Sequence, residues 1–392
     1  MFSVKLLLMV AWSIYLPLLV IGNVFLEERL VISVIPVNVF MFFVLLLPAM
    51  VLNTKFRRKK SVALAVVSLI PFTVVFGITA ILYSPEFLGV QKYLNLIILG
   101  YLGAILLLIA HDSGHLEILL KLTIVFLFIL FIFAIVYKSY FGFWRRDIPY
   151  FMNGAIVFGR NMCAGFFLAL FFLKDSRIYY LLCMCFLFGI LWSMSKGPIA
   201  AFIICFLFFL ANKNKKYFLF YTLIIGTGLA AIINGTFDFS GTSFNRVQIG
   251  LQALFGLLPS SSASGSLDAR TEMYVPTLDL IKSHFFTGVG PGNWSGAINS
   301  QFNYPHNLFL EAYSELGIVT GTLLLVPLCL FVPYFKHQMY ILPLFFLISH
   351  QVSGDLADAR WLLLFSILVF TTDNNVLVRN SQAELRSSAS SS

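Results

Sequence analysis

Charged residues are scarce in this sequence. Only 11% of its 392 residues are Asp, Glu, Lys or Arg, while 59% are hydrophobic, and the mean hydropathy is +0.91. A soluble globule of this length needs a larger polar surface, so the composition excludes ordinary soluble enzymes and binding modules. Acidic residues are the scarcest, with 17 Asp and Glu against 26 Lys and Arg. We therefore expect an integral membrane protein, with membrane lipids among its partners and no nucleic acid.

The sequence also lacks the alternation of apolar and polar residues that marks strands of a membrane barrel. Stretches such as residues 122–136 (LTIVFLFILFIFAIV) are apolar at every position. An uninterrupted apolar run of this kind indicates a helix buried in lipid or among other helices. The predicted fold class is therefore an all-α polytopic membrane protein.

Clusters of metal ligands are missing too. The five cysteines lie inside apolar runs, and no pair has the spacing of a zinc or redox site. The closest acidic pair is Asp355 and Asp358, which a helix cap or a partner for Arg360 explains equally well. The glycine-rich segment 288–292 has no Walker lysine. We expect no metal and no cofactor.

Long apolar runs define the predicted domains. Counting about 20 apolar residues per span predicts about twelve transmembrane helices. Residues 1–233 hold helices 1–9, residues 234–316 form one long loop, residues 317–372 hold helices 10–12, and residues 373–392 form a disordered tail. The predicted spans are 3–25, 30–52, 62–83, 92–110, 120–138, 154–173, 178–194, 197–211, 217–233, 317–334, 339–352 and 361–372.

The distribution of positive charge predicts the orientation. The loop at residues 55–60 (KFRRKK) carries five basic residues, which favour the cytoplasmic side. Alternation of the spans then puts both termini in the cytoplasm and places residues 138–153, 235–316 and 351–360 outside. The middle stretch is much longer than a connection needs, so we expect it to carry function. Within it, residues 247–258 and 270–283 have apolar stripes typical of amphipathic helices.

Basic residues on the external side are the main functional signal, because the orientation rule should make them rare there. An arginine as deep as Arg160 usually faces a bundle interior or a wet cavity. Converging cations suit an anionic ligand such as a lipid diphosphate. Simpler interpretations stay open: Arg145 and Arg146 as membrane-interface anchors, Arg246 as a solvated loop residue, or Arg360 paired with Asp355 or Asp358. The external basic residues are Arg145, Arg146, Lys196, Arg246, Arg270 and Arg360, with Arg160 inside the sixth span.

Two positions have more specific surroundings. Lys196 lies in a short turn (SKGP) at a predicted helix N-terminus, where both the ammonium group and the helix dipole attract anions, although a snorkelling lysine fits as well. His306 follows Tyr304 and Pro305 at the predicted outer surface, where an imidazole is suited to act as a general base. A histidine before a helix is also often a cap or a structural donor.

Together these motifs resemble a known family. The sequence is similar to the signature of the O-antigen ligase and polymerase superfamily at three places: Arg270 with the following amphipathic helix, residues 286–294 (FTGVGPGNW) and residues 304–317 (YPHNLFLEAYSELG). These proteins are glycosyltransferases of the bacterial envelope. Twelve spans with one long periplasmic loop between helices 9 and 10 also resemble that superfamily, whose fold is similar to GT-C glycosyltransferases.

The resemblance implies a metal-independent, inverting glycosyl transfer at the periplasmic face of the inner membrane. The donor would be a glycan on undecaprenyl diphosphate, and the acceptor a lipid-linked glycan or lipid A-core. His306 matches the family's loop histidine and Arg270 its loop arginine, while Lys196 stands where many members have arginine. Diphosphate contacts are also expected from Arg160, Arg360, Arg145 and Arg146. A chain-length regulator protein is an expected partner.

The acceptor separates two activities in lipopolysaccharide assembly. Gly317 and Gly321 are one residue further apart than in the usual ligase ending, and the segment around His306 is more similar to repeat-unit polymerases. We therefore favour a polymerase, with an O-antigen ligase as the alternative. A lipid-linked glycan transporter is the alternative of another class. It is disfavoured because transporters usually bind near the midplane, where this sequence has few charges.

Overall fold

The computed structural model describes the chain in separate ranges. They are residues 4–21, 67–68, 70–82, 87–145, 147–151, 154–173, 178–213, 215–234, 248–249, 252, 268–300, 302–354 and 356–372. The span predicted at 30–52, nearly all of the amphipathic helix predicted at 247–258, and the tail at 373–392 lie outside these ranges.

Every regular element in the described ranges is a helix. Three short 3-10 turns, η4 (Val332–Tyr334), η5 (Gln338–Tyr340) and η6 (Ala357–Ala359), connect the last helices. The α-helices are α1 (Val4–Ile21), α5 (Ile70–Leu82), α6 (Phe87–Asp112), α7 (Leu116–Phe141), α8 (Ala155–Phe172), α9 (Tyr179–Trp192), α10 (Lys196–Lys213), α11 (Lys215–Ile233), α13 (Asp268–Ser283), α14 (Trp294–Ala297), α15 (Leu308–Cys329), α16 (Ile341–Ser353) and α17 (Arg360–Thr371).

Length and composition identify membrane helices among them. Within the described ranges, four stretches are long and apolar enough to cross a membrane: 116–141, 155–172, 196–213 and 308–334. Shorter apolar helices occur at 4–17, 99–112, 179–192 and 338–352. The predicted all-α membrane class is therefore confirmed in its general form.

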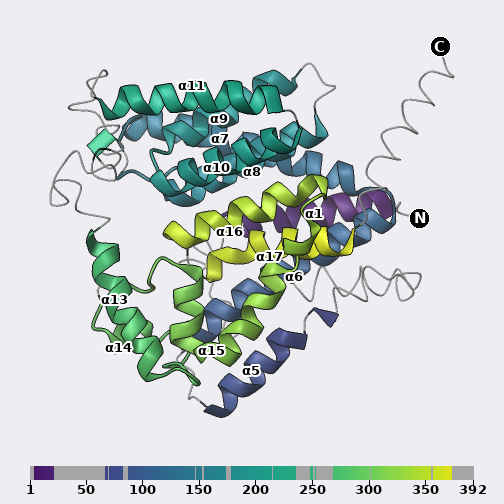
Figure 1. The fold of residues 1–392 in the computed structure, drawn as a ribbon. Coiled ribbons are helices and arrows are strands. Elements are labelled where there is room, and N and C mark those ends of the chain that lie inside the picture. The colour runs from purple at the N-terminus through teal and green to yellow at the C-terminus, as the bar shows by residue number, and fades with distance from the viewer. Residues whose placement is uncertain are drawn as a thin grey trace.

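The helices form a bundle in which small residues permit close contact. Figure 1 shows α7, α9, α10 and α11 on one side, α5 and α15 on the other, and α16 and α17 between them. A Cβ added to Gly100 of α6 would lie 2.5 Å from the side chain of Leu363 of α17. A Cβ added to Gly165 of α8 would lie 2.6 Å from the ring of Phe186 of α9. Close approach of this kind supplies the packing that holds helices together in lipid.

Helix α15 begins earlier than the span predicted at 317–334. Asn307 caps its N-terminus, with Oδ1 accepting hydrogen bonds of 3.0 Å from the backbone N–H groups of Phe309 and Leu310. The helix then kinks at Gly317, whose φ is +71°. The first turns of α15 contain the two glutamates of the YPHNLFLEAYSELG motif, which a hydropathy count does not assign to a span.

The glycine-rich motif lies against this kink. The backbone N–H groups of Val289 and Gly290 donate to the carbonyls of Ser314 and Glu315, and that of Ile318 donates to Phe285, at 2.8–2.9 Å. At the end of the same motif, Trp294 is fully buried and donates from Nε1 to Thr277 Oγ1 of α13 at 2.9 Å. The two family motifs thus form one unit with α13.

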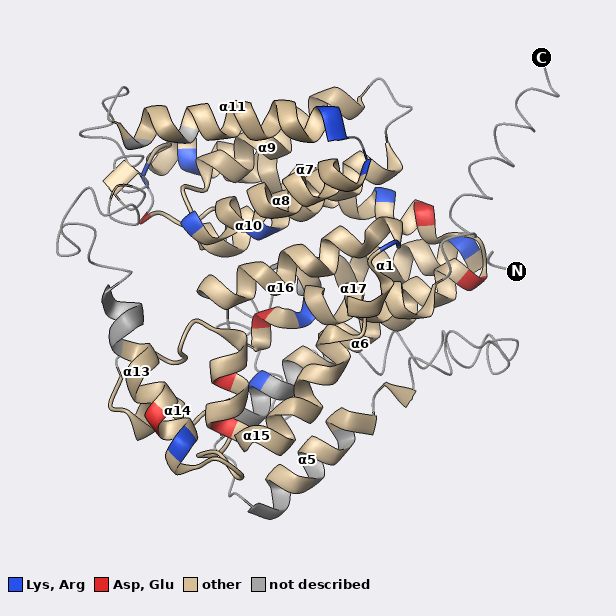
Figure 2. Cartoon of the chain, in the orientation of Figure 1, with Lys and Arg blue, Asp and Glu red and all other residues tan. Residues whose placement is uncertain are grey.

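Contacts between helix ends define two ends of the bundle. The last turn of α1 meets the first turns of α8 and α17: Asn161 Nδ2 donates to the Val20 carbonyl and Arg360 Nε to the Leu19 carbonyl. We call this the site end, and the end where α1 begins the opposite end. Figure 2 shows that the charged residues of the described ranges gather towards the two ends of the helices.

Candidate active site

Arg160 is held inside the bundle at the site end. It lies in the second turn of α8, and only 3% of its surface is exposed. Its Nε donates to Ser349 Oγ of α16 at 2.9 Å, and its Nη1 lies 3.5 Å from Asp358 Oδ2. The expectation that this arginine faces the bundle interior is met, because its partners come from two other elements.

Arg360 faces the same carboxylate from another direction. It is the first residue of α17 and is also buried; its Nη1 lies 3.4 Å from Asp358 Oδ1. The pairing of Arg360 with Asp358, one of the simpler interpretations, is therefore present. We call Arg160, Asp358 and Arg360 the arginine pair site. Two guanidinium groups share one carboxylate whose side chain is 29% exposed, so these three formal charges sum to +1.

Lys196 lies at the first position of α10, in a turn that packs on α8. A Cβ added to Gly159, the residue before Arg160, would lie 2.8 Å from Ser193 Oγ and 3.3 Å from Pro198. The backbone of Met194 in the same turn has a φ of +50°. This close packing places the turn that carries Lys196 beside the helix position that carries Arg160.

His306 lies in the loop just before α15, in a left-handed backbone conformation with a φ of +57°. Its ring lies 4.5 Å from the ring of Tyr304 and 5.7 Å from that of Phe302, centroid to centroid. The next residue, Asn307, donates from Nδ2 to the carbonyl of Gln351 at 3.1 Å. His306 is thus tied to the end of α16, the helix whose Ser349 holds Arg160.

A buried charge cluster that the sequence analysis missed lies beside this loop. Glu311 and Glu315 of α15 are fully buried, and both pair with Lys92 of α6, with Lys92 Nζ 3.0 Å from Glu315 Oε1. Glu311 Oε2 also accepts from the backbone N–H of Leu356, two residues before Asp358, at 2.8 Å. The available signal was two glutamates spaced i, i+4 in an otherwise apolar run, because intramembrane charges seldom occur without a partner.

Arg145 has a different environment from Arg160 and Arg360. It is exposed, and its Nη2 lies 2.6 Å from Asp147 Oδ2. The hydrogen bond from this guanidinium lowers the pKa of Asp147 below its ordinary value, and the same contact raises the pKa of Arg145. Since both groups are fully exposed, the pair is a local surface contact. The described contacts do not connect Arg145 to the arginine pair site.

Lys138, another residue that the sequence analysis passed over, anchors the loop that carries Arg145. It is fully buried at the end of α7 and donates from Nζ to the carbonyls of Arg145 and Ile148. The same ammonium lies 4.2 Å from the centroid of the Tyr150 ring. Tyr150 in turn donates to the carbonyl of Trp192 at the end of α9, at 2.6 Å. The loop is therefore fixed to two helix ends.

Two predicted residues have no described side chain. Arg270 is the third residue of α13, so the helix predicted at 270–283 is present. Arg146 lies outside the described residues. Among the described side chains, no group of three or more His, Cys, Asp or Glu residues is close enough to hold a metal ion.

The candidate site is built from several helices, and a sequence comparison covers part of them. Residues 181–326 match the O-antigen ligase family model. The match runs from α9 to α15 and includes Lys196, Arg270 and His306. It confirms the resemblance to the O-antigen ligase and polymerase superfamily and implies a glycosyltransferase-like enzyme embedded in a membrane. No curated protein matches the chain.

Proposed function

We propose that this protein transfers a glycan from undecaprenyl diphosphate to a sugar hydroxyl at the periplasmic face of the bacterial inner membrane. The product would be O-antigen or a related surface polysaccharide. The observation that carries this proposal is the arginine pair site, which lies at the same end of the bundle as the loop with His306. The O-antigen ligase family match supports the reaction class.

The arginine pair site has the charge that a diphosphate requires. The two guanidinium–carboxylate distances, 3.5 and 3.4 Å, are longer than the roughly 2.7–2.9 Å of a strong charge-assisted hydrogen bond. Two buried guanidinium groups that lie around one carboxylate favour phosphate binding, because their N–H donors match phosphate oxygens in geometry and charge. In this proposal Arg160 and Arg360 bind diphosphate oxygens, and Lys196 and Arg270 add positive charge from α10 and α13. Arg145 and Arg146 are proposed to contact the diphosphate from the outer side of the site.

The reaction needs a base and a stabilised leaving group. His306 takes the proton from the acceptor hydroxyl as its oxygen attacks the anomeric carbon, and the bond from that carbon to the diphosphate oxygen breaks. In-line attack inverts the anomeric configuration. Because undecaprenyl diphosphate leaves as an anion, fixed cations that contact it stabilise the charge that develops in the transition state. Holding acceptor and donor in line supplies much of the remaining rate enhancement.

The acceptor decides between two forms of this activity. The one-residue wider spacing of Gly317 and Gly321 and the segment around His306 favour the polymerase, in which the acceptor is another lipid-linked glycan. The matching family is named for O-antigen ligase, which favours the ligase, in which the acceptor is lipid A-core. We propose the polymerase, and we propose a chain-length regulator protein as its partner in the membrane.

The proposal is tested with the full chain purified in detergent. It is given an undecaprenyl-diphosphate oligosaccharide with or without lipid A-core, without nucleotide or added metal, and the products are separated by size. Longer lipid-linked glycans in the absence of lipid A-core are expected. Product that forms only on lipid A-core would establish the ligase instead. Donor that binds without any product would favour the transporter.

Matched variants connect the result to the site. Arg160→Gln should reduce product formation, because it removes a buried guanidinium from the arginine pair site. Lys282→Gln is the control, since Lys282 is an exposed base paired with Asp279 on α13. Equal activity of the two variants would contradict the assignment of the diphosphate to Arg160.

A further inference from the structure

A second feature with ligand-binding chemistry lies at the opposite end of the bundle. A cavity of about 470 Å³ opens between the last turns of α10 and the segment that connects α15 to α16. None of the predicted site residues lines it. Helix α10 begins at Lys196 and ends at Lys213, a length of about 27 Å at 1.5 Å per residue, so the cavity is separated from the site end by nearly a whole membrane span.

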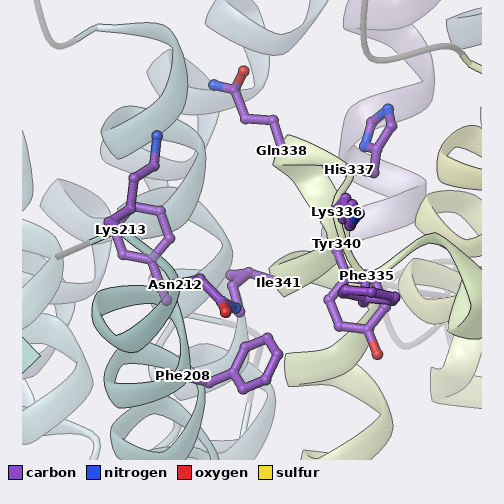
Figure 3. Close-up of a pocket in the computed structure, with 10 residues that line it drawn as sticks. Phe208, Asn212, Lys213, Phe335, Lys336, His337, Gln338, Tyr340 and Ile341 are labelled. Carbon is purple, nitrogen blue, oxygen red and sulfur yellow. The ribbon is translucent and has the colours of Figure 1, made fainter. Parts of the chain in front are cut away.

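The cavity wall has polar side chains at one end, while the other end combines aromatic rings with the amide of Asn212 and the hydroxyl of Tyr340 (Figure 3). Figure 3 shows the ammonium group of Lys213 and the amide of Gln338 at one end, and the ring of Phe208 at the other. Lys213 is the last residue of an apolar helix long enough to span a membrane, and Phe208 lies five positions inside it. A membrane-crossing helix with these ends places Lys213 at the interface and Phe208 at the level of the hydrocarbon.

The charge on the polar part has one sign. Lys213 and Lys336 both line the cavity, and among its described lining residues there is no Asp or Glu. Each ammonium lies near an aromatic ring, with Lys213 Nζ 5.9 Å from the Phe209 centroid and Lys336 Nζ 5.8 Å from the Phe335 centroid. Two lysines over apolar rings favour an anionic group attached to an apolar body.

The wall opposite α10 is held in place by His337. Its Nδ1 accepts from the backbone N–H of Met339 at 3.1 Å, and its Nε2 lies 3.1 Å from Thr372 Oγ1 at the end of α17. Since Nδ1 accepts, the ring proton is assigned to Nε2, which donates to the hydroxyl. The buried, neutral imidazole therefore fixes the turn that carries Lys336 to α17.

We propose that this cavity binds the phosphate headgroup of an anionic phospholipid, with Lys213 and Lys336 at the phosphate and the first part of the acyl chains beside Phe208. The charge pattern of the sequence predicts this end to be cytoplasmic, where anionic headgroups attract basic side chains. The proposal is independent of the transferase function, because it involves neither the arginine pair site nor His306.

The test is native mass spectrometry of the full chain in detergent during titration with phosphatidylglycerol. Phosphatidylcholine with the same acyl chains and soluble glycerol phosphate are titrated in parallel. Phosphatidylglycerol should bind most tightly. The variant Lys213→Ala/Lys336→Ala should bind it about thirtyfold more weakly, because a basic side chain at an anionic lipid surface contributes about 1 kcal/mol. Lys213→Arg/Lys336→Arg should retain binding.

A matched double variant controls for net charge. Lys121→Ala/Lys282→Ala also removes two exposed lysines, each paired with a nearby carboxylate outside the cavity, and should bind phosphatidylglycerol like the unaltered chain. Equal loss of phosphatidylglycerol binding in both double variants would overturn the site, since it would mean that the lipid responds only to the net charge of the protein. Equal binding of phosphatidylcholine would overturn the role of headgroup charge. Equally tight binding of glycerol phosphate would identify a soluble anion and overturn the lipid.

Discussion

Gly288 and Gly317 lie backbone against backbone. A Cβ on Gly288 would lie 2.5 Å from the amide nitrogen of Gly317, and a Cβ on Gly317 would lie 2.7 Å from the amide nitrogen of Thr287. Both glycines also have positive φ angles, +68° and +71°. This contact joins the glycine-rich loop to the kink of α15, the helix that His306 precedes.

Substitution of these glycines should therefore destabilise the protein. In Gly317→Ala, left-handed backbone strain of about 1–2 kcal/mol adds to the displacement of a hydrogen-bonded loop, so we expect a loss of about 3 kcal/mol. Thermal unfolding in detergent measures the change. Gly296→Ala is the matched control, because Gly296 is helical and a Cβ there would contact nothing within 4 Å. An equal loss in both variants would contradict the close contact.

Replacement of His306 should abolish transfer without unfolding the loop. His306→Asn is the informative variant, since asparagine tolerates a positive φ better than most residues but has no basic nitrogen. Loss of a general base lowers the rate about 10²–10⁴-fold. Single-turnover rates with bound donor measure this loss, and melting temperature reports folding. The exposed His284 provides the comparison variant, His284→Asn, for which we expect an unchanged rate.

Removal of a positive charge and removal of the negative charge from the arginine pair site should have opposite effects on anion binding. Arg160→Gln should weaken inhibition of transfer by added inorganic pyrophosphate, because a buried guanidinium is lost. Asp358→Asn should strengthen it, because the carboxylate competes with the anion for both arginines. We expect at least tenfold between the two inhibition constants. If both variants weakened inhibition equally, the contact between Arg160 and Asp358 would be structural and would not bind the anion.

Lys92 should matter far more for stability than an ordinary lysine. Lys92→Met leaves Glu311 and Glu315 buried without their shared cation, which typically costs about 3–5 kcal/mol. Lys121→Met removes a lysine from an exposed i, i+4 pair with Glu117 and should change stability by about 0.5 kcal/mol or less. Thermal unfolding of the two variants, side by side, distinguishes them; similar midpoints would show that the buried cluster contributes little.

Apolar runs were sufficient to predict several of the described helices. The predicted ranges 154–173 and 178–194 agree closely with α8 and α9, because a run of lipid-compatible residues with no competing turn signal has one stable local structure. The prediction was less accurate at the start of α15. There Asn307 and two glutamates make the first turns look like a loop, and only their partners Gln351 and Lys92 show why the segment is helical.

The site residues were predictable by type but not by arrangement. Depth in an apolar run singled out Arg160, and the acidic residues Asp355 and Asp358, five and two positions before Arg360, suggested a partner for Arg360. No local pattern indicates that Ser349 and Asp358 converge on Arg160. They lie 189 and 198 positions after Arg160 and approach it only when α8, α16 and α17 pack. The predicted roles of all the site residues stay predictions: His306, Arg270, Lys196, Arg160, Arg360, Arg145 and Arg146.

The hydrogen bond from Asn307 to Gln351 limits where segments of this protein can be exchanged for those of a homologous protein. A chimera that exchanges only the residues before Tyr304 keeps the His306 loop, α15, α16 and Arg360 from one parent, so the arrangement of His306 relative to Arg360 is inherited intact, and the hydrogen bond from Arg160 to Ser349 joins the two parents. A crossover placed between α15 and α16 instead combines an asparagine from one parent with a carbonyl from another. Functional hybrids with altered acceptor preference should therefore accept crossovers upstream of Tyr304 and reject those within residues 330–340.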